Sequence, residues 1–450
     1  MSIDVHRRVR SKATSPGVRP PTGTVLGSMA AGAAAAALLT MLVLPGATEG
    51  VTAGATLLGF GLGWAMLRVR SSRTSSPQPW AAIPAVAMAS TGAALMAVAP
   101  SDHTMTMLTW VWPALALALS VWTYVRMRRD LTGPGRWLVT LALVLLAGAS
   151  VGAGVRNIAT DSFANTYPAP GAIHSVGDHD LHLDCRGQGQ PTVVLVSGLG
   201  EFSGSWARIL DGVAPSTRVC AYDRAGQGWS DDVEQPQDGI AAAEDLHALL
   251  AAAGETGPFV LVGHSIGGPY AMTYAASFAD EVAGMVLLDS TSPEQFTALP
   301  GYPTQYAMMR RAYGVMPTLA RLGLGVALAG SHLPADDAAP VDAWSATPRA
   351  GRNARDELSM LPVLFEQARA FTTLGDRPLV VLTSAENARD TDGWTEAQEH
   401  MAELSSNAVT REAAASHAGV VEDPGGAAAS VQAITSVVRA VCTGTALTTR

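Results

Sequence analysis

The sequence predicts an all-α region of five membrane-spanning helices followed by an α/β domain with a mostly parallel, doubly wound sheet. Hydrophobic residues make up 48% of the 450 residues and charged residues only 15%, a composition too apolar for an ordinary cytosolic enzyme. The apolar excess lies almost wholly before residue 156. After that residue, short apolar runs alternate with helical patterns, which is typical of a doubly wound sheet.

Five apolar stretches precede residue 156, and each is near the length that crosses about 30 Å of hydrocarbon. They lie at about 24–44, 51–67, 80–99, 107–125 and 137–155, in a predicted membrane region at 23–156. The basic tail at 1–22 would also suit a cleaved signal peptide, but four further stretches follow and weaken that interpretation. Because the stretches contain essentially no ionisable side chains, we expect an anchor rather than a transport pathway.

The loops between these stretches alternate in charge. Two loops hold Glu49 and Asp102, whereas the amino-terminal tail and the other two loops are basic. The basic loop residues are Arg68, Arg70, Arg73, Arg126, Arg128, Arg129 and Arg136. Since basic loops stay in the cytoplasm, the sequence predicts a multi-pass cell-membrane protein with a cytoplasmic amino terminus and an extracytoplasmic carboxyl-terminal domain.

The rest of the chain divides into a linker, a domain with eight strands and one long helical insertion. Residues 157–172, which include two prolines, are a predicted linker. The predicted strands lie near 173–176, 179–185, 192–197, 218–222, 259–262, 284–288, 378–383 and 408–412. Between about 293 and 374 the sequence is mainly helical and too long for a plain connection. Its apolar run at 316–328 could line a pocket, pack onto the core or dip into the membrane interface.

A serine stands on a sharp turn within the segment from Phe259 to Gly268, where an apolar strand runs into Gly-x-Ser-x-Gly and then a helical pattern. Gly263 and Gly267 flank Ser265 because a strand that reverses into a helix leaves no room for side chains there. The free N–H groups of the helix start then point toward an oxygen that becomes negative during acyl transfer. A chance match is the alternative, but the strand before and the helix after favour a nucleophile.

Residues 173–442 resemble the α/β-hydrolase family in several motifs that occur in the family's order. The matching segments are 192–200, 222–231, the serine turn, 285–289 and Ser416-His417. The resemblance implies a mostly parallel sheet with helices on both faces and an active site at the carboxyl ends of the strands. It also implies that the insertion at about 293–374 is a cap over that site.

A serine hydroxyl needs an imidazole to take its proton and a carboxylate to orient the imidazole. In this family the chain order is serine, acid, histidine. His417 follows the last predicted strand and matches the family's histidine. His400 lies in a helical segment and is expected at the surface, whereas His264, inside the serine turn, is expected to pack.

The acid is less well determined by the sequence. The loop after 378–383 has Asn387 where the family usually has an aspartate, with Glu386, Asp390 and Asp392 nearby. Asp289, at the end of the preceding strand, is the position that some members use, and it is our first choice. Asp390 or Asp392 is the alternative acid, in which case Asp289 only binds the turn that follows it.

Two backbone N–H groups are expected to form the oxyanion hole, those of Leu199, after the third strand, and Ile266, after the nucleophile. The segment 222–231 is similar to a turn of the family and is assigned a structural role, with Asp223 and Arg224 pairing locally. No metal and no cofactor are expected, because no Cys/His spacing resembles a metal site and no Gly-rich phosphate loop follows a strand.

The formal net charge is −9, with the basic residues gathered at the membrane and the acids in the second domain, so nucleic-acid binding is not expected. All three cysteines, Cys185, Cys220 and Cys442, lie in the part predicted to be outside. One disulfide is possible there, and the spacing does not choose between the pairs.

These features predict a membrane-anchored serine hydrolase that cleaves a small, hydrophobic carboxylic ester through an acyl-enzyme. Serine at position 265 argues against the dehalogenase and epoxide-hydrolase branches, which use an aspartate nucleophile. An aminopeptidase, an acyltransferase, a non-catalytic membrane-tethered sensor and a transporting bundle are the alternatives. The natural substrate and the oligomeric state are not predicted.

Overall fold

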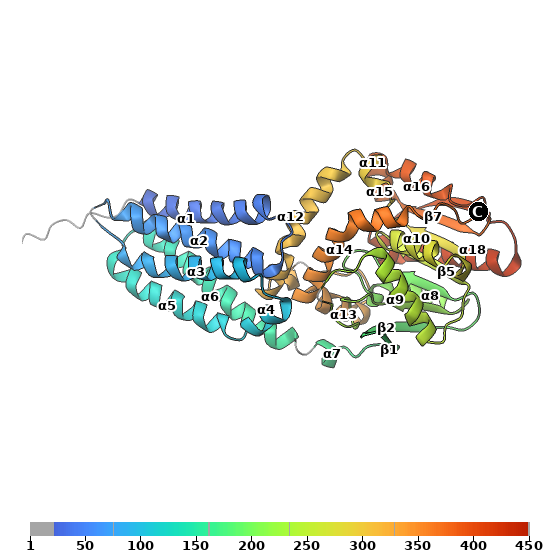
Figure 1. The fold of residues 1–450 in the computed structure, drawn as a ribbon, viewed down its shortest axis with the longest axis horizontal. Coiled ribbons are helices and arrows are strands. Elements are labelled where there is room, and N and C mark those ends of the chain that lie inside the picture. The colour runs from blue at the N-terminus through green and yellow to red at the C-terminus, as the bar shows by residue number, and fades with distance from the viewer. Residues whose placement is uncertain (1–21, 75, 161–162, 234, 328, 449–450) are drawn as a thin grey trace, which may run out of the picture.

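The computed structural model describes residues 22–448 apart from 75, 161–162, 234 and 328. A helical bundle lies at one end of the molecule and an α/β domain at the other, joined by helices that contact both (Figure 1). The predicted basic tail, except for its last residue, falls outside the described residues.

The bundle consists of six helices, among the residues that the structure describes. They are α1 (Thr22–Leu38, continued by a π-helical turn to Val43), α2 (Glu49–Ser71), α3 (Ala82–Val98), α4 (Asp102–Leu108), α5 (Trp112–Asp130) and α6 (Pro134–Thr160). Four segments, Thr22–Val43, Glu49–Ser71, Pro79–Val98 and Pro134–Val155, are long and apolar enough to cross a membrane. Close packing is possible because small residues meet, as where Gly59 of α2 lies against Ala36 of α1.

The predicted continuous span at 107–125 is wrong. That segment falls on α4 and α5, which meet at a bend of 49° and together could form one broken span. Pro113 stands in the first turn of α5, where its missing N–H cannot continue the preceding helix. The predicted linker is also partly helical, because α6 runs to Thr160 and α7 (Phe163–Thr166) follows.

An eight-stranded sheet with the order β1-β2-β4-β3-β5-β6-β7-β8 forms the centre of the α/β domain. The strands are β1 (Ala172–Val176), β2 (His179–Arg186), β3 (Val193–Val196), β4 (Val219–Tyr222), β5 (Phe259–His264), β6 (Val282–Leu288), β7 (Leu379–Ser384) and β8 (Ala408–Ala413). β2 pairs antiparallel with β1 and β4, and all other neighbours are parallel. The sheet confirms the predicted fold class, and each predicted strand is present.

Helices cover both faces of the sheet, as a parallel sheet requires. Alternate residues of β3 show the division, because Val194 and Val196 join one core cluster and Val193 and Leu195 the other. The first cluster packs against α9 (Gly239–Ala252), α10 (Gly267–Ser277) and α14 (Pro348–Ala368). The second packs against α8 (Ala207–Val213), α17 (Gly419–Glu422) and α18 (Pro424–Thr443). α18 is apolar enough for a membrane span but packs on the sheet.

The segment between β6 and β7, called the cap below, holds α11 (Gln295–Ala298), α12 (Tyr302–Arg321), α13 (Ala335–Ser345) and α14. α12 packs along α14 and reaches the bundle (Figure 1). At its end, Arg321 binds Glu49 at the start of α2 through two hydrogen bonds of 2.5 and 2.7 Å. The described part of the apolar run, residues 316–327, lies at this junction, where Pro317 contacts α14 and Leu322 approaches Gly152 of α6.

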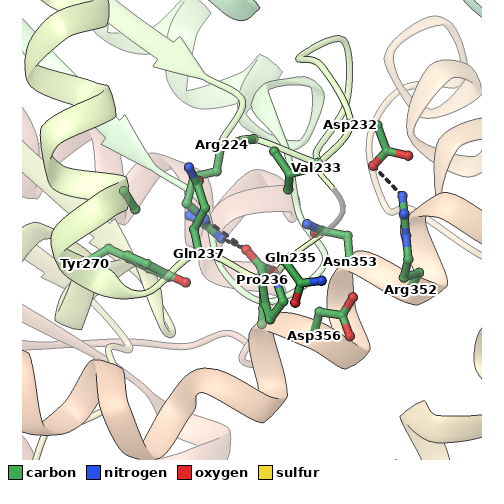
Figure 2. Close-up of a pocket in the computed structure, with 14 residues that line it drawn as sticks. Arg224, Asp232, Val233, Gln235, Pro236, Gln237, Tyr270, Arg352, Asn353 and Asp356 are labelled. Atoms are coloured by element: carbon green, nitrogen blue, oxygen red, sulfur yellow. Dashed lines mark hydrogen bonds and ion pairs between the residues drawn. The ribbon is translucent and has the colours of Figure 1, made fainter. Parts of the chain in front are cut away.

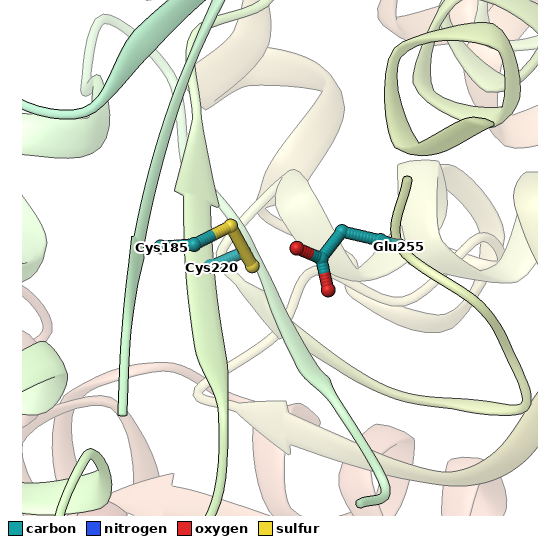
Figure 3. Close-up of side chains that lie close together, drawn as sticks. All are labelled: Cys185, Cys220 and Glu255. Atoms are coloured by element: carbon teal, nitrogen blue, oxygen red, sulfur yellow. A yellow bond between two sulfur atoms is a disulfide. The ribbon is translucent and has the colours of Figure 1, made fainter. Parts of the chain in front are cut away.

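Cys185 and Cys220 form a disulfide between the paired strands β2 and β4, and Cys442 is free and exposed. Glu255 lies close to both sulfurs (Figure 3), and among the described residues these three are the one group with the spacing of a metal site. The sulfurs are bonded to each other, and both carboxylate oxygens of Glu255 accept hydrogen bonds from Arg218. The group is therefore a structural cross-link beside an ion pair.

Candidate active site

Ser265 lies on the turn between β5 and α10, half-exposed, with a φ of 53° in the left-handed region. Such a conformation costs a non-glycine residue about 1–3 kcal/mol and persists only where the surroundings enforce it. A Cβ on Gly263 would lie 2.5 Å from the nitrogen of Gly268, and one on Gly267 would lie 2.1 Å from the carbonyl oxygen of Val196. The two glycines therefore let α10 start directly against β3 and β5, with Ser265 on the bend.

Asp289 and His417, which follow β6 and β8, are in direct contact. His417 Nδ1 donates a hydrogen bond of 2.6 Å to Asp289 Oδ2. The carboxylate is fully buried, whereas the imidazole side chain is 37% exposed. Each strand that carries these residues is parallel to β5, so both side chains emerge at the same edge of the sheet as Ser265.

The alternative acids lie elsewhere. Asp390 is at the surface and pairs with Arg389, and Asp392 is exposed. Neither is bonded to His417 within the part of the chain that the structure describes. Glu386 accepts a hydrogen bond of 2.8 Å from the backbone N–H of His417 and does not contact its ring nitrogens.

Donors surround the carboxylate of Asp289. The backbone N–H and hydroxyl of Ser384 donate to it, as do the amide of Asn387 and the indole of Trp394, at 2.7–3.0 Å. Burial alone favours the protonated carboxyl, but the hydrogen bond and charge of His417 and the donors of Ser384 outweigh it, so the pKa of Asp289 lies below its ordinary value. Asn387, at the family's usual acid position, thus supports the acid instead of replacing it.

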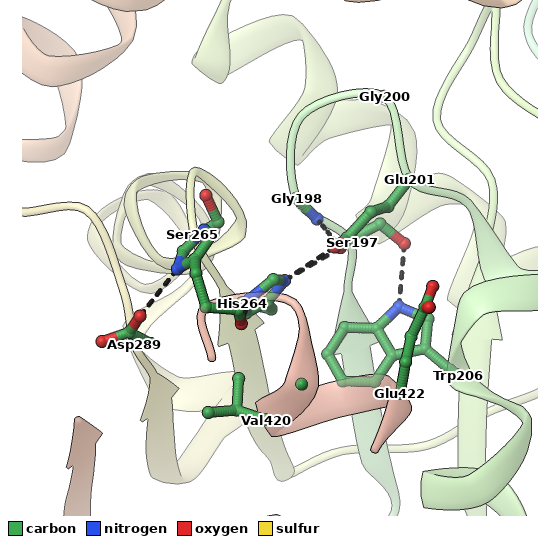
Figure 4. Close-up of polar contacts among 12 residues, drawn as sticks. Ser197, Gly198, Gly200, Glu201, Trp206, His264, Ser265, Asp289, Val420 and Glu422 are labelled. Atoms are coloured by element: carbon green, nitrogen blue, oxygen red, sulfur yellow. Dashed lines mark hydrogen bonds and ion pairs between the residues drawn. The ribbon is translucent and has the colours of Figure 1, made fainter. Parts of the chain in front are cut away.

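His264 does more than pack, contrary to the sequence expectation. Its Nε2 donates a hydrogen bond of 3.0 Å to the carbonyl oxygen of His417, and its Nδ1 lies 3.0 Å from Glu201 Oε2. The same oxygen accepts a hydrogen bond of 2.7 Å from the N–H of Gly198 (Figure 4). Glu201 and His264 therefore connect the loop after β3 with the loop that carries His417.

The two side chains favour each other's charged form. Burial disfavours a charged imidazole, but the charge and hydrogen bond of Glu201 outweigh burial and raise the pKa of His264. Burial raises the pKa of Glu201, but the charge and hydrogen bond of His264 outweigh burial and lower this pKa. The pair was not predictable from the sequence, because its members are 63 residues apart. The available signal was a carboxylate immediately after Ser-Gly-Leu-Gly.

The loop from Ser197 to Glu201, called the oxyanion loop below, lies against the serine turn, because a Cβ on Gly198 would be 3.1 Å from the Cβ of Ser265. The N–H groups of Gly198 and Gly200 donate to carboxylates. Among the described residues, the N–H groups of Leu199 and Ile266 have no acceptor. The two predicted oxyanion donors are thus available to a ligand.

Asp223 and Arg224 do not pair with each other, so that expectation is wrong. Asp223 pairs with His182 at 2.9 Å, and Arg224 pairs with Glu357 of the cap at 2.7 Å. Side chains of successive residues in extended chain point to opposite sides, which separates the two. Both ion pairs are buried.

Comparison with known proteins identifies relatives of the α/β domain. The model of the alpha/beta hydrolase family matches residues 193–431. An uncharacterized protein of Schizosaccharomyces pombe is 33% identical over 162 residues, 29% of this chain and 30% of that protein. Lipase LipV of Mycobacterium tuberculosis is 40% identical over 111 residues, 24% of this chain and 41% of LipV. The matches span less than half of these relatives' own length.

A solved structure of a thermophilic esterase from Thermogutta terrifontis aligns with 60% of this chain and 98% of its own. The identity is 23% and the TM-score 0.46.

The Glu201–His264 pair predicts a pH-dependent contribution to stability. Because the pKa of His264 is raised on folding, the stabilisation is complete below about pH 6.5 and is lost as the pH rises through the folded-state pKa. Glu201→Gln should remove it, so the difference in melting temperature between wild type and variant should be largest near pH 6 and shrink toward about pH 9. Thermal unfolding of the full-length protein in detergent measures this difference.

Glu244→Gln on α9, where the side chain is exposed, is the matched control and should show no such trend. A difference for Glu201→Gln that stays constant or grows with pH would contradict the charged pair.

Proposed function

This chain belongs to the alpha/beta hydrolase family, and we propose that it is a membrane-anchored serine hydrolase that cleaves carboxylic esters on the extracytoplasmic side. One observation carries the proposal. A serine on a left-handed turn follows β5, and an imidazole and a buried carboxylate that are bonded to each other follow β8 and β6, so all three residues lie at the carboxyl edge of the parallel strands. This combination of groups is what acyl transfer through a serine requires.

In the proposed reaction, His417 Nε2 takes the proton of Ser265 as the hydroxyl oxygen attacks the ester carbonyl carbon. Asp289 holds the Nδ1 proton and stabilises the imidazolium. The carbonyl oxygen becomes an oxyanion that accepts hydrogen bonds from the N–H groups of Leu199 and Ile266. The C–O bond to the alcohol then breaks, and the alcohol leaves with the proton from His417. Water attacks the acyl-enzyme by the same steps and releases the acid.

The charge distribution supports the extracytoplasmic placement. α2 begins with Glu49 against the cap and runs away from it, so Arg68 and Arg70 in its last turn are at the opposite end of the bundle. α5 likewise ends with Arg128 and Arg129. Basic ends of this kind mark the cytoplasmic side. The disulfide between β2 and β4 agrees with an oxidising compartment for the α/β domain.

Apolar side chains of the core cluster that contains Ile266 support a hydrophobic substrate. Ile266, which follows the proposed nucleophile, belongs to a core cluster against which partly buried apolar side chains of the oxyanion loop and the cap pack. These side chains are Leu199, Phe296, Tyr306, Met309 and Tyr313. An acyl chain that reached this surface would be removed from water.

The proposed nucleophile predicts selective labelling by fluorophosphonates. Wild type should react covalently and Ser265→Ala should not, because the probe requires an activated serine. A membrane-impermeant fluorophosphonate applied to intact cells, followed by gel fluorescence, tests the nucleophile and its sidedness together. Ser277→Ala, an exposed serine on α10, is the matched control and should label like wild type. Labelling of Ser265→Ala would contradict the nucleophile, and an unreactive wild type would favour a sensor.

The acid predicts unequal effects of two isosteric substitutions. Asp289→Asn should lower kcat by about 10⁴-fold, because the amide neither holds the neutral imidazole in the required tautomer nor stabilises the imidazolium. Asp390→Asn should stay near wild type, since Asp390 pairs with Arg389 at the surface. Steady-state hydrolysis of p-nitrophenyl butyrate by the full-length protein measures both. Near-wild-type rates for Asp289→Asn would remove it as the acid.

The apolar side chains around the site predict a preference for longer acyl chains. Burying one methylene is worth about 0.8 kcal/mol, so kcat/KM should rise by up to about fourfold per methylene until the pocket is filled. Hydrolysis of p-nitrophenyl esters from acetate to octanoate measures this slope. A strict preference for acetate would argue against a hydrophobic substrate.

A further inference from the structure

Arg224 and Glu357 hold the oxyanion loop from two sides. Arg224 Nη1 donates a hydrogen bond of 2.7 Å to the carbonyl oxygen of Ser197, and its Nη2 donates one of 3.1 Å to that of Gly198. Glu357 Oε2 accepts a hydrogen bond of 3.3 Å from the N–H of Gly200. The Gly198 carbonyl belongs to the same peptide group as the Leu199 N–H, and the other two contacts hold the peptide groups before and after it, so together they determine where that N–H points.

Arg224 and Glu357 also hold each other. Nε and Nη2 of Arg224 donate to Glu357 Oε1 at 2.9 and 2.7 Å, and Gln227 Nε2 donates to the same oxygen at 2.9 Å. The side chains are only 4% and 8% exposed. A buried charge that loses its partner is strongly destabilised, so Arg224 depends on Glu357 to stay in place.

Glu357 belongs to the cap, not to the sheet that carries the rest of the site. Its helix, α14, is bound to the bundle by Arg352, which donates a hydrogen bond of 2.6 Å to Asp102 of α4. Arg355 of α14 donates to the carbonyl oxygen of Ala47, just before α2. One helix thus contacts the oxyanion loop and the membrane bundle.

Close packing does not fully fix α14 beside this ion pair. A cavity of about 30 Å³ lies between α14, α10 and the loop after β4, with Arg224, Tyr270 and Asn353 among its lining residues (Figure 2). A cavity of this size holds one or two water molecules. Packing therefore leaves room beside the ion pair, although Leu358, Leu361 and Leu364 of α14 are buried in the core.

We propose that Glu357 is a positioning residue for the oxyanion loop. We also propose that the position of the cap relative to the bundle determines, through α14, the position of this loop. The inference rests on the proposed serine-hydrolase function. With Glu357 in place, the Leu199 N–H points toward the oxyanion. When α14 shifts, the loop loses the acceptor of the Gly200 N–H, and Arg224 loses its counter-ion.

The main test is Glu357→Gln in the full-length protein. Since the change acts on the transition state, kcat should fall by about 10²–10³-fold, while KM changes by less than about threefold. The affinity for an aryl trifluoromethyl ketone, whose serine adduct carries an oxyanion, should fall in parallel with kcat. Glu366→Gln, an exposed glutamate on the same helix, is the matched control and should behave as wild type.

A purely structural role would lower the melting temperature without a parallel loss of kcat and ketone affinity, and that result would overturn the proposal. Should Glu357→Gln fail to fold, Glu357→Asp is the second variant. It retains a carboxylate that can pair with Arg224, but the shorter side chain does not reach the N–H of Gly200. It should lose about 10-fold or more in kcat, and full activity would overturn the proposal. An unlabelled wild type in the fluorophosphonate experiment would instead overturn the hydrolase function itself.

A double-mutant cycle tests the link to the bundle. Asp102→Asn weakens the contact of Arg352 and should lower kcat by about 3–10-fold in the wild-type background but little in the Glu357→Gln background. If Asp102→Asn lowered kcat by the same factor in both backgrounds, the proposed link between the bundle and the oxyanion loop would be overturned.

Discussion

The close approach of α10 to β3 and β5 is the constraint on which the candidate site depends. Gly267 lies so near the carbonyl oxygen of Val196 that any side chain there would separate the helix from the strand. The same approach forces Ser265 into the left-handed region and leaves the N–H of Ile266 without an acceptor at the start of the helix. A single packing requirement thus exposes the hydroxyl and, in the proposed reaction, provides a donor for the oxyanion.

The other groups of the site reach the serine on loops from different strands, and buried charges connect these loops. His264 binds the backbone of the His417 loop and, through Glu201, the loop after β3. Arg224 and Glu357 hold that second loop from the opposite side. Loops alone would be mobile, whereas these contacts attach each of them to the sheet or to the cap. The geometry is therefore maintained by ion pairs that take no direct part in the proposed chemistry.

The central strands, β3 to β7, were predictable because a parallel sheet is buried on both faces, so these strands read as apolar runs. The bend within the span at 107–125 was not predictable, because the sequence stays apolar on both sides of Pro113, where the helix bends. Chain order left the acid open, since Asp289, Asp390 and Asp392 all precede the histidine. Only the folded chain brings Asp289 to a residue 128 positions away. Glu357 had no local signal, because these contacts join it to residues at least 130 positions away.

The ion pair between Glu49 and Arg321 joins residues that are 272 positions apart. During translation the ribosome makes the acidic partner first, so the bundle can insert in the bilayer long before the arginine exists. In the proposed topology, the pair forms only after the later segment has been translocated to the same side. If one of the spans between them failed to insert, Glu49 and Arg321 would lie on opposite sides of the membrane, and the cap would lack this contact with the bundle.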